Sequence, residues 1–224
     1  MTRTELYLDK RRRLLRDGSG RRYDLETREW SADEDTVSGA RTDLRGALAW
    51  LQRDSGAPRR EPVAVVGGRH ASAQDLAQAA EVGRALADLG CVVLCGGRGG
   101  VMRAVCEGVA ERGGMSIGLL PGDTIAEANA AVTVPIATGI GFARNALIAR
   151  AALCLVAIGG SYGTLSEIAY GMQFGKAILA LPGTPKVDGV VPVASVDAAI
   201  DGVARVALGL DGGRRAAAEP PVDR

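Results

Sequence analysis

From Pro62 onward, short runs of apolar residues alternate with longer stretches of helical periodicity. Within the runs nearly every residue is apolar, rather than every second one, which indicates strands buried on both faces. Such strands occur in parallel sheets that are covered by helices, so the alternation predicts βα units. We therefore expect an α/β fold with a doubly wound parallel sheet and helices on both faces. The five expected strands lie within residues 63–68, 91–97, 115–122, 152–160 and 177–183.

The segment between the first two runs shows how the expected helices are specified. Small and apolar residues between Leu76 and Leu86 recur at helical spacing, Ser72 is placed to cap the N-terminus, and Gly90 follows the C-terminus. Several of the expected helices begin next to glycines at the carboxyl end of a strand. In open α/β sheets that edge is where ligands bind. Further helical patterns cover residues 101–114, 141–151 and 162–176.

The first sixty residues differ in character from the rest of the chain. They predict two short strands around the turn at residues 17–20, followed by a helix that closes on Trp50 and Leu51. Residues 54–62 are the expected linker. The expected organisation is a hairpin-plus-helix extension (1–58), a main domain (59–210) and a flexible tail (211–224).

Arginines are frequent in this extension, and a basic arm that binds nucleic acid is one interpretation. Acidic residues are interleaved with the arginines, which favours a solvated hairpin that packs on the main domain or on a partner subunit. The net charge of +1 over the whole chain also gives no general attraction to nucleic acid or membranes. The interleaved acidic residues are Asp9, Asp17, Asp24, Glu26 and Glu29.

Length and composition suit one soluble globular domain, because the chain has 224 residues of which 47% are apolar. The sequence has no apolar stretch of membrane-spanning length and no signal peptide pattern, so we expect a cytoplasmic protein. The single histidine, His70, follows a strand; an exposed loop position is favoured over contact with a ligand. The four cysteines lie in apolar runs and are expected to be small buried hydrophobes, with no disulfide framework and no metal site: Cys91, Cys95, Cys106 and Cys154.

Glycine-rich loops follow three of the expected strands. A helix N-terminus carries unpaired N–H groups and partial positive charge, and glycines there let a phosphate approach closely. Neither longer loop fits G-x-G-x-x-G with its acidic residue, and the P-loop pattern is absent, so a NAD-type or P-loop enzyme is disfavoured. We expect a phosphorylated small molecule at this edge. The candidate binding residues are Gly67, Gly68, Gly96, Gly97, Gly99, Gly100, Gly159, Gly160, Ser161, Gly163 and Thr164.

Two charged residues near these loops allow two interpretations each. Thr164 and Glu167 fit the S/T-x-x-E capping box, in which both side chains satisfy backbone N–H groups at a helix start. Alternatively, Glu167 is catalytic and Arg144 is its partner. Arg144 shares a helix face with Leu147 and Ile148, so its guanidinium either extends to solvent or faces an anion at the sheet edge.

Three linked motifs resemble the LONELY GUY (LOG, or SLOG) superfamily of Rossmann-like proteins. "GGSYGTLSE" is similar to its P-G-G-x-G-T-x-x-E signature, "CGGRGGVMRAV" to its G-G-G-x-x-G-x-M loop, and "GFARNALIARAA" to its arginine-bearing helix. The resemblance covers roughly residues 62 to 210 and looks closest to the molybdenum cofactor carrier-like branch. Ile158 replaces the expected proline, and the link after Glu167 is short, which departs from the cytokinin-type phosphoribohydrolases.

The resemblance implies roles for particular residues. Gly159, Gly160, Gly163 and Thr164 would hold a phosphate, while Glu167 and Arg144 match the catalytic pair of the family's hydrolases. The implied ligand is molybdenum cofactor or a nucleoside monophosphate, with no cofactor required for chemistry. The family's common assembly implies a homodimer.

Three functions follow from these observations. The favoured one is a protein that binds a phosphorylated, nucleotide-like ligand, as a molybdenum cofactor carrier does. The second is a phosphoribohydrolase that cleaves a nucleoside 5′-monophosphate into free base and ribose 5-phosphate. The third is a sensor module that responds to nucleotide through the N-terminal extension.

Overall fold

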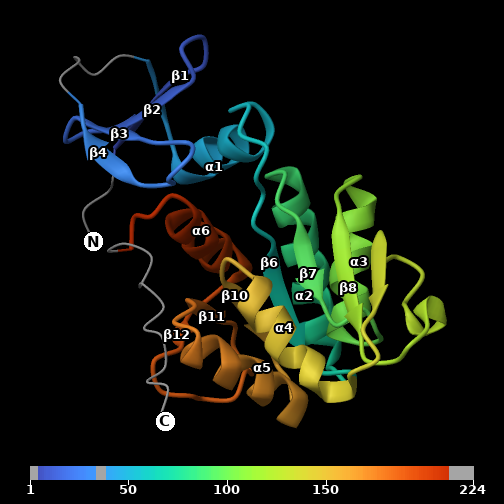
Figure 1. The fold of residues 1–224 in the computed structure, drawn as a ribbon. Coiled ribbons are helices and arrows are strands. Elements are labelled where there is room, and N and C mark those ends of the chain that lie inside the picture. Colours follow the sequence, from blue (N-terminus) through green and yellow to red (C-terminus); the bar gives the residue numbers. More distant parts are fainter. Residues whose placement is uncertain (1–4, 34–38, 212–224) are drawn as a thin grey trace, which may run out of the picture.

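The computed structural model describes residues 5–33 and 39–211, so most of the expected tail lies outside the described residues. Two β-sheets organise this part of the chain (Figure 1). The larger sheet has seven strands, and every neighbouring pair in it is parallel. Its strands, in spatial order, are β12 (Val191–Pro192), β11 (Ile178–Ala180), β10 (Leu155–Ile158), β6 (Val63–Gly67), β7 (Val93–Cys95), β8 (Ser116–Leu120) and β9 (Val134–Ala137).

Helices cover both faces of this sheet, as the sequence predicts. One face packs against α2, α3 and α6, and the other packs against α4 and α5. Two short 3₁₀ helices, η1 and η2, lie before β9 and before α4. The expected α/β, Rossmann-like, doubly wound fold is therefore confirmed. The helices are α2 (Ala73–Asp88), α3 (Val101–Glu111), η1 (Ile125–Glu127), η2 (Gly141–Ala143), α4 (Arg144–Ala151), α5 (Tyr162–Gln173) and α6 (Val196–Ala207).

All five expected strands are present, and their runs are almost entirely buried. Ser72 caps α2 and Gly90 follows it in the left-handed region, both as predicted. The four cysteines are buried, also as predicted. Among the described residues, no helix has the length and apolar character needed to cross a bilayer.

The strand order places a topological switch point between β10 and β6. From β6 the chain proceeds outward through β7, β8 and β9, whereas β11 and β12 extend the sheet on the opposite side of β10. The loops after β6 and β10 therefore leave the same edge toward opposite faces. This is the position at which open α/β sheets bind ligands.

The smaller sheet, at the N-terminus, contains the predicted hairpin, β2 and β3 around the turn at residues 17–20. It has five antiparallel strands in the order β4-β3-β2-β1-β5, so it is larger than the two strands expected. The helix α1 (Leu44–Arg53) follows it, with Trp50 and Leu51 buried. The strands are β1 (Leu6–Asp9), β2 (Leu14–Asp17), β3 (Arg21–Tyr23), β4 (Trp30–Ala32) and β5 (Ala40–Thr42).

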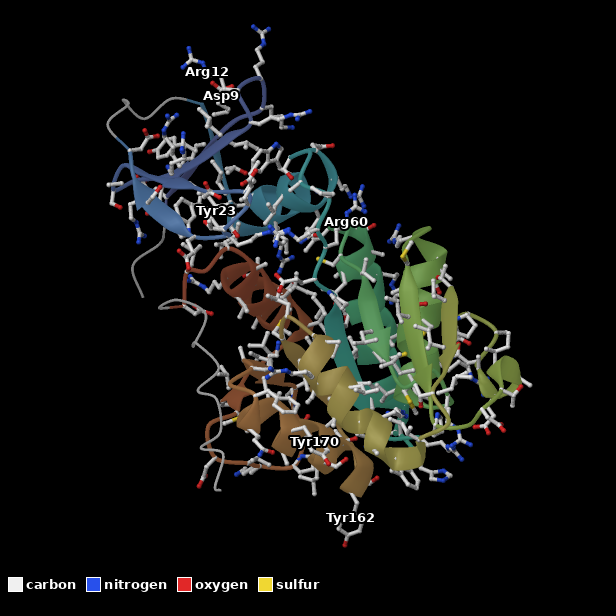
Figure 2. All side chains as sticks on the ribbon, in the orientation of Figure 1. Asp9, Arg12, Tyr23, Arg60, Tyr162 and Tyr170 are labelled. Carbon is white, nitrogen blue, oxygen red and sulfur yellow. The ribbon has the colours of Figure 1, made fainter. Side chains whose placement is uncertain are left out.

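The smaller sheet packs against the end of α6 within the same chain. Tyr23 donates a hydrogen bond from its hydroxyl to the carbonyl oxygen of Ala207 at 2.9 Å, and the indole of Trp30 donates to that of Leu208 at 2.5 Å (Tyr23 is labelled in Figure 2). The side chain of Leu208 is fully buried among the apolar residues of this sheet and α1. Tyr23 and Trp30 therefore donate to the carbonyls of the last residue of α6 and of its C-cap residue, which have no partner inside the helix.

Tyr23→Phe tests this docking, because it removes the hydroxyl and leaves the ring. We expect the free energy of unfolding to fall by about 1 kcal/mol, since the buried carbonyl of Ala207 loses its donor. Tyr7→Phe is the matched control: its hydroxyl makes only an exposed 3.3 Å contact with Glu5, so the change should be a few tenths of that or less. Urea unfolding measures both. Equal effects of the two substitutions would show that the Tyr23 contact does not hold the sheets together.

Candidate functional site

The structure brings the three glycine loops together at the switch point. The backbone N–H of Val101 donates to the carbonyl oxygen of Gly68 at 3.1 Å. A Cβ atom at Gly100 would lie 2.3 Å from that same oxygen, and a Cβ at Gly68 would lie 3.5 Å from the Cα of Gly160. The loops after β6, β7 and β10 are thus in contact through backbone atoms. A side chain at Gly100 would collide with the backbone of the loop after β6, and Gly100 also has positive φ, which is the physical reason for glycine there.

The helices α3, α4 and α5 begin without a capping side chain; α4 continues directly from the 3₁₀ helix η2, whereas α3 and α5 begin at glycine loops. The N-cap residues of α3 and α5 are Gly100 and Ser161, and neither makes a side-chain capping hydrogen bond. By contrast, Asp43, Ser72 and Ser195 each accept a backbone N–H at the starts of α1, α2 and α6. The first N–H groups of α5 therefore remain open to a ligand, whereas at α3 the N–H of Val101 is already bonded to the carbonyl of Gly68; each helix dipole favours an anion at its start.

Arg144 and Glu167 form a buried ion pair beside these loops. The Nη1 atom of Arg144 lies 3.1 Å from Oε1 of Glu167, and each residue is 6% exposed. Arg144 is the first residue of α4 and Glu167 lies in α5, so the pair joins the two helices. The guanidinium of Arg144 points into the protein rather than to solvent.

The capping-box interpretation of Thr164 and Glu167 is wrong. The helix α5 begins at Tyr162 with Ser161 as its N-cap, so Thr164 already lies inside the first turn. Glu167 is consequently a turn too far along to reach the N-cap backbone. Its carboxylate accepts a hydrogen bond from Arg144 instead.

Gly96 lets the ion pair reach the loop after β7. A Cβ atom at Gly96 would lie 2.3 Å from Nη2 of Arg144, and Nη2 lies 3.5 Å from the carbonyl oxygen of Gly96. Glycine at this position therefore makes room for the guanidinium. The contact connects Arg144, on α4, with the glycine loop that opens α3.

Asn145 is a site residue that the sequence reasoning did not select. Its Oδ1 accepts from Nη1 of Arg144 at 2.6 Å, and its Nδ2 donates to the hydroxyl of Ser166 at 2.7 Å. Nδ2 also lies within hydrogen-bonding distance of the carbonyl oxygen of Gly163, at 3.3 Å. The sequence marks Asn145 only by its position directly after Arg144, because its burial and its contacts appear only in the folded chain. Asn145 ties the arginine to the first turns of α5.

Two buried polar atoms at the site have no hydrogen-bond partner among the described residues. They are Oγ1 of Thr164, whose residue is 2% exposed, and Nε of Arg144. A Cβ atom at Gly160 would lie 2.4 Å from the Thr164 hydroxyl, so that hydroxyl sits against the turn that opens α5. Buried polar atoms in proteins normally have a hydrogen-bond partner. A ligand bound beside the open helix ends would supply a partner for these two atoms.

Burial shifts the titration of Glu167. Loss of hydration raises the pKa of its carboxyl to about 7, although the charge and hydrogen bond of Arg144 act to lower it. Glu167 therefore changes protonation near neutral pH. A carboxyl of this kind can serve either as an acid or as a base.

The remaining predicted residues lie around this centre. Gly67 packs against Val101 and the carbonyl of Ile158, and Gly97 and Gly159 adopt positive φ. Gly99 and Gly163 have open surroundings, and Ser161 is exposed at the start of α5. His70 is exposed in the loop after β6, as predicted. Within residues 5–33 and 39–211, no group of three or more histidine, cysteine or acidic side chains could hold a metal ion.

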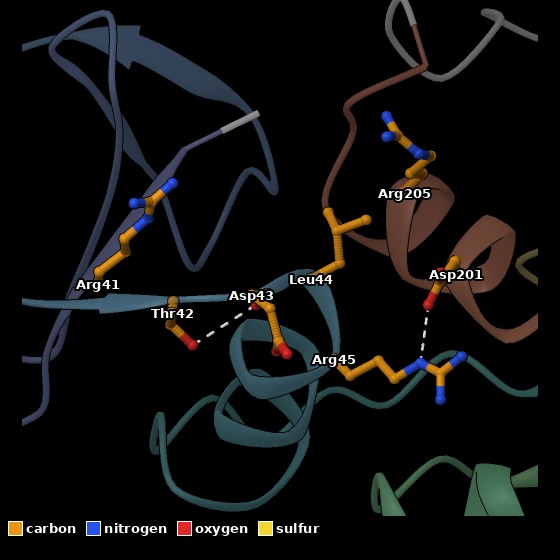
Figure 3. Close-up of a pocket in the computed structure, with 7 residues that line it drawn as sticks. All are labelled: Arg41, Thr42, Asp43, Leu44, Arg45, Asp201 and Arg205. Atoms are coloured by element: carbon orange, nitrogen blue, oxygen red, sulfur yellow. Dashed lines mark hydrogen bonds and ion pairs between the residues drawn. The ribbon is translucent and has the colours of Figure 1, made fainter. Parts of the chain in front are cut away.

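A cavity of about 790 Å³ lies away from the glycine loops, between β5, α1 and α6 (Figure 3). Arg45 spans it, with Nε 2.7 Å from Asp201 and Nη2 2.9 Å from Asp197. These ion pairs connect α1 to α6. The cavity therefore lies where the N-terminal part of the chain, through β5 and α1, packs against α6.

Several known proteins resemble this chain in sequence and in fold. An uncharacterized protein of Archaeoglobus fulgidus is 34% identical over 128 residues, which are 57% of this chain and 84% of the relative. The solved molybdenum cofactor binding protein of Rippkaea orientalis is 30% identical, with a TM-score of 0.62 over 65% of this chain and 96% of that one.

The molybdenum cofactor carrier protein of Chlamydomonas reinhardtii is 34% identical, with a TM-score of 0.61 over 66% of this chain and 98% of that one. Both solved structures match only part of this chain, although each is covered almost completely. The model of the SLOG cluster4 family matches residues 60–200, which include all three glycine loops and the Arg144–Glu167 pair. The chain therefore belongs to the SLOG cluster4 family.

Proposed function

We propose that this protein binds a phosphorylated, nucleotide-like ligand at its glycine loops, in the manner of a molybdenum cofactor carrier. The observation that carries the proposal is the convergence of three glycine loops with the uncapped N-termini of α3 and α5 at the switch point. Backbone N–H groups there can donate to phosphate oxygens without any charged side chain. The similarity to two proteins named for molybdenum cofactor supports the choice of ligand.

The residues present fit the phosphate of such a cofactor. The backbone of residues 159–163 and the hydroxyl of Thr164 would hold it, since that hydroxyl is buried and has no partner in the described part of the chain. Arg144 would add positive charge from the side of α4. A bound molybdenum cofactor would supply its metal centre as cargo, and the chain would supply the phosphate-binding groups that retain it.

Thr164→Val tests this phosphate binding, because valine has nearly the same shape and lacks the hydroxyl. The unliganded protein should be as stable as wild type or more so, since the substitution removes an unsatisfied buried group. Affinity for AMP and for molybdenum cofactor should fall roughly tenfold, the usual cost of a hydrogen bond to a charged group. Calorimetric titration and thermal unfolding measure the two effects.

Thr138→Val is the matched control for this substitution. The Thr138 hydroxyl donates to the carbonyl of Leu120 at 2.7 Å, in the loop after the edge strand β9. Its loss should lower stability and leave ligand affinity unchanged. If Thr164→Val destabilises the protein without weakening binding, Thr164 is a structural residue and its proposed phosphate-binding role is wrong.

A second function is favoured by one specific observation, the buried Arg144–Glu167 pair at the same edge. In a phosphoribohydrolase the carboxylate would stabilise an oxocarbenium ion developing at the ribose, or would position the attacking water. The arginine would support the phosphate or the departing base. The test is release of free base and ribose 5-phosphate from nucleoside 5′-monophosphates.

For such a hydrolase, Glu167→Gln should reduce turnover by about a hundredfold, because the amide keeps the shape and loses the charge. The wild-type rate should rise with pH and level off above about 7, where Glu167 becomes ionised. Absence of turnover in wild type would reject this function, and turnover that survives the substitution would show that the proposed role of Glu167 is wrong. Neither result would affect the proposed binding of ligand.

We also propose a homodimer formed through the helical segment that carries Arg144. Phe142 is 82% exposed and Leu147 is 46% exposed, and together with Ile140, 47% exposed, they place three exposed large apolar side chains on one short segment. Family resemblance supports a second copy of this chain as the partner. The ion pair would then lie on a helix that also forms the interface.

Substituting serine for both Phe142 and Leu147 should convert the dimer to monomer in sedimentation velocity, without loss of thermal stability in the monomer fold. Met115→Ser is the control, because Met115 is 48% exposed but lies between α3 and β8. A wild-type monomer would contradict the proposal. So would a dimer that resists the double substitution.

A further inference from the structure

Asp75 places a second carboxylate at the switch point, on the opposite face of the sheet from Glu167. It lies in the first turn of α2, which leaves the sheet edge directly after the loop of β6. A Cβ atom at Gly159 would lie 3.0 Å from Cγ and from both carboxylate oxygens of Asp75. The carboxylate therefore packs beside the residue that begins the loop after β10.

Only one oxygen of Asp75 is used to cap α2. Its Oδ2 accepts from the backbone N–H of Ser72 at 3.0 Å and from the Ser72 hydroxyl at 2.8 Å. The second oxygen, Oδ1, makes no hydrogen bond or ion pair to any residue in the described ranges. Asp75 is half-buried. The hydrogen bonds that fix Oδ2 hold the whole carboxylate in place, and with it the second oxygen, Oδ1.

The free oxygen faces the edge of the sheet where ligands bind. A Cβ at Gly159 would lie 3.0 Å from Oδ1, and a Cβ at Gly183, in the turn after β11, would lie 3.8 Å from it. Gly159 and Gly183 end adjacent strands, and both have positive φ. Oδ1 is thus surrounded by loops at the carboxyl ends of β6, β10 and β11.

A fixed carboxylate beside a phosphate site needs a physical reason, because like charges disfavour each other at short range. The carboxylate becomes favourable when the ligand presents a hydrogen-bond donor to it. In dinucleotide-binding α/β sheets an acidic residue accepts from a ribose hydroxyl at this kind of crevice. Here the acidic residue comes from the first turn of α2 instead of a later strand.

We propose that Oδ1 of Asp75 accepts a hydrogen bond from a hydroxyl or amine N–H of the ligand, next to the phosphate held by α5. The inference rests on the proposed function and adds a specificity residue to it. The ligand class is a phosphate ester with a donor group near its phosphate. Ribose hydroxyls and the amino group of a purine or pterin are the two sources of that donor.

Asp75→Asn tests the assignment without removing the cap. The amide oxygen can replace Oδ2 in accepting from Ser72, which leaves the NH₂ group where Oδ1 was. The position thus changes from acceptor to donor at almost constant shape. Ser72→Ala is the matched control, since it weakens the same cap and retains both oxygens of Asp75.

Calorimetric titrations of wild type and both variants would use four nucleotides and inorganic phosphate. AMP against 2′,3′-dideoxy-AMP tests the ribose hydroxyls, and GMP against IMP tests a purine amine. Wild type should prefer the donor-bearing member of one pair roughly tenfold. Asp75→Asn should abolish that preference, while Ser72→Ala should keep it, even at lower thermal stability.

The outcomes separate this inference from the proposed function. Equal binding within both pairs by wild type, or an unchanged preference in Asp75→Asn, overturns the role of Asp75 while the phosphate site stands. Binding of inorganic phosphate without binding of any nucleotide also overturns the role of Asp75 and leaves the phosphate site in place. Failure to bind phosphate and all four nucleotides overturns both the site and the role of Asp75.

Discussion

The buried ion pair between Arg144 and Glu167 is the interaction on which the geometry of the site depends. Removing two charges from water costs several kcal/mol, which is recovered only when the remaining donors and acceptors find good partners. The terminal nitrogens of Arg144 find partners in Glu167, in Asn145 and at the carbonyl of Gly96, whereas its Nε has none among the described residues. These contacts require α4, α5 and the loop after β7 to meet. The absence of a side chain at Gly96 makes that meeting sterically feasible.

Around this pair the chain leaves its backbone donors open where they can serve a ligand. The helices α1, α2 and α6 are capped by their own side chains, whereas α3 and α5 begin with glycine-rich turns and no such cap. Capping contributes about 1 kcal/mol to a helix, so its omission at the two central helices has a cost in stability. An anion at these ends would replace the missing caps. The buried hydroxyl of Thr164, which lacks a partner in the described residues, fits the same explanation.

Much of the fold was readable from the sequence because the central strands are buried on both faces. The strands β9 and β12 escaped prediction for the opposite reason: they are sheet edges, β9 alternates in exposure, and β12 has two exposed residues, one of them proline. The three extra N-terminal strands are three or four residues long, too short for a periodic signal. The contacts of this sheet with the end of α6 join residues far apart in the sequence, which no local pattern encodes.

The site was predictable in its parts but not in its assembly. The glycine loops identified the binding edge, yet contact between Gly68 and residues of two other loops depends on strand order. The pattern at Thr164 and Glu167 fitted a cap, but α5 begins earlier, at Tyr162 with Ser161 as its N-cap, and Glu167 contacts Arg144 instead. Asn145 and Asp75 carried no motif. Their importance comes from neighbours that lie close only in the folded chain.

The most direct test of the account is an amide ¹H–¹⁵N spectrum of the protein recorded with increasing AMP. The account predicts that the largest shifts occur at the backbone N–H groups of residues 97–101 and 160–164, where α3 and α5 begin. The starts of α1 and α6, which carry side-chain caps, should not change. Shifts confined to other parts of the chain, or no shifts at saturating ligand, would contradict the claim that the open helix ends form the binding site.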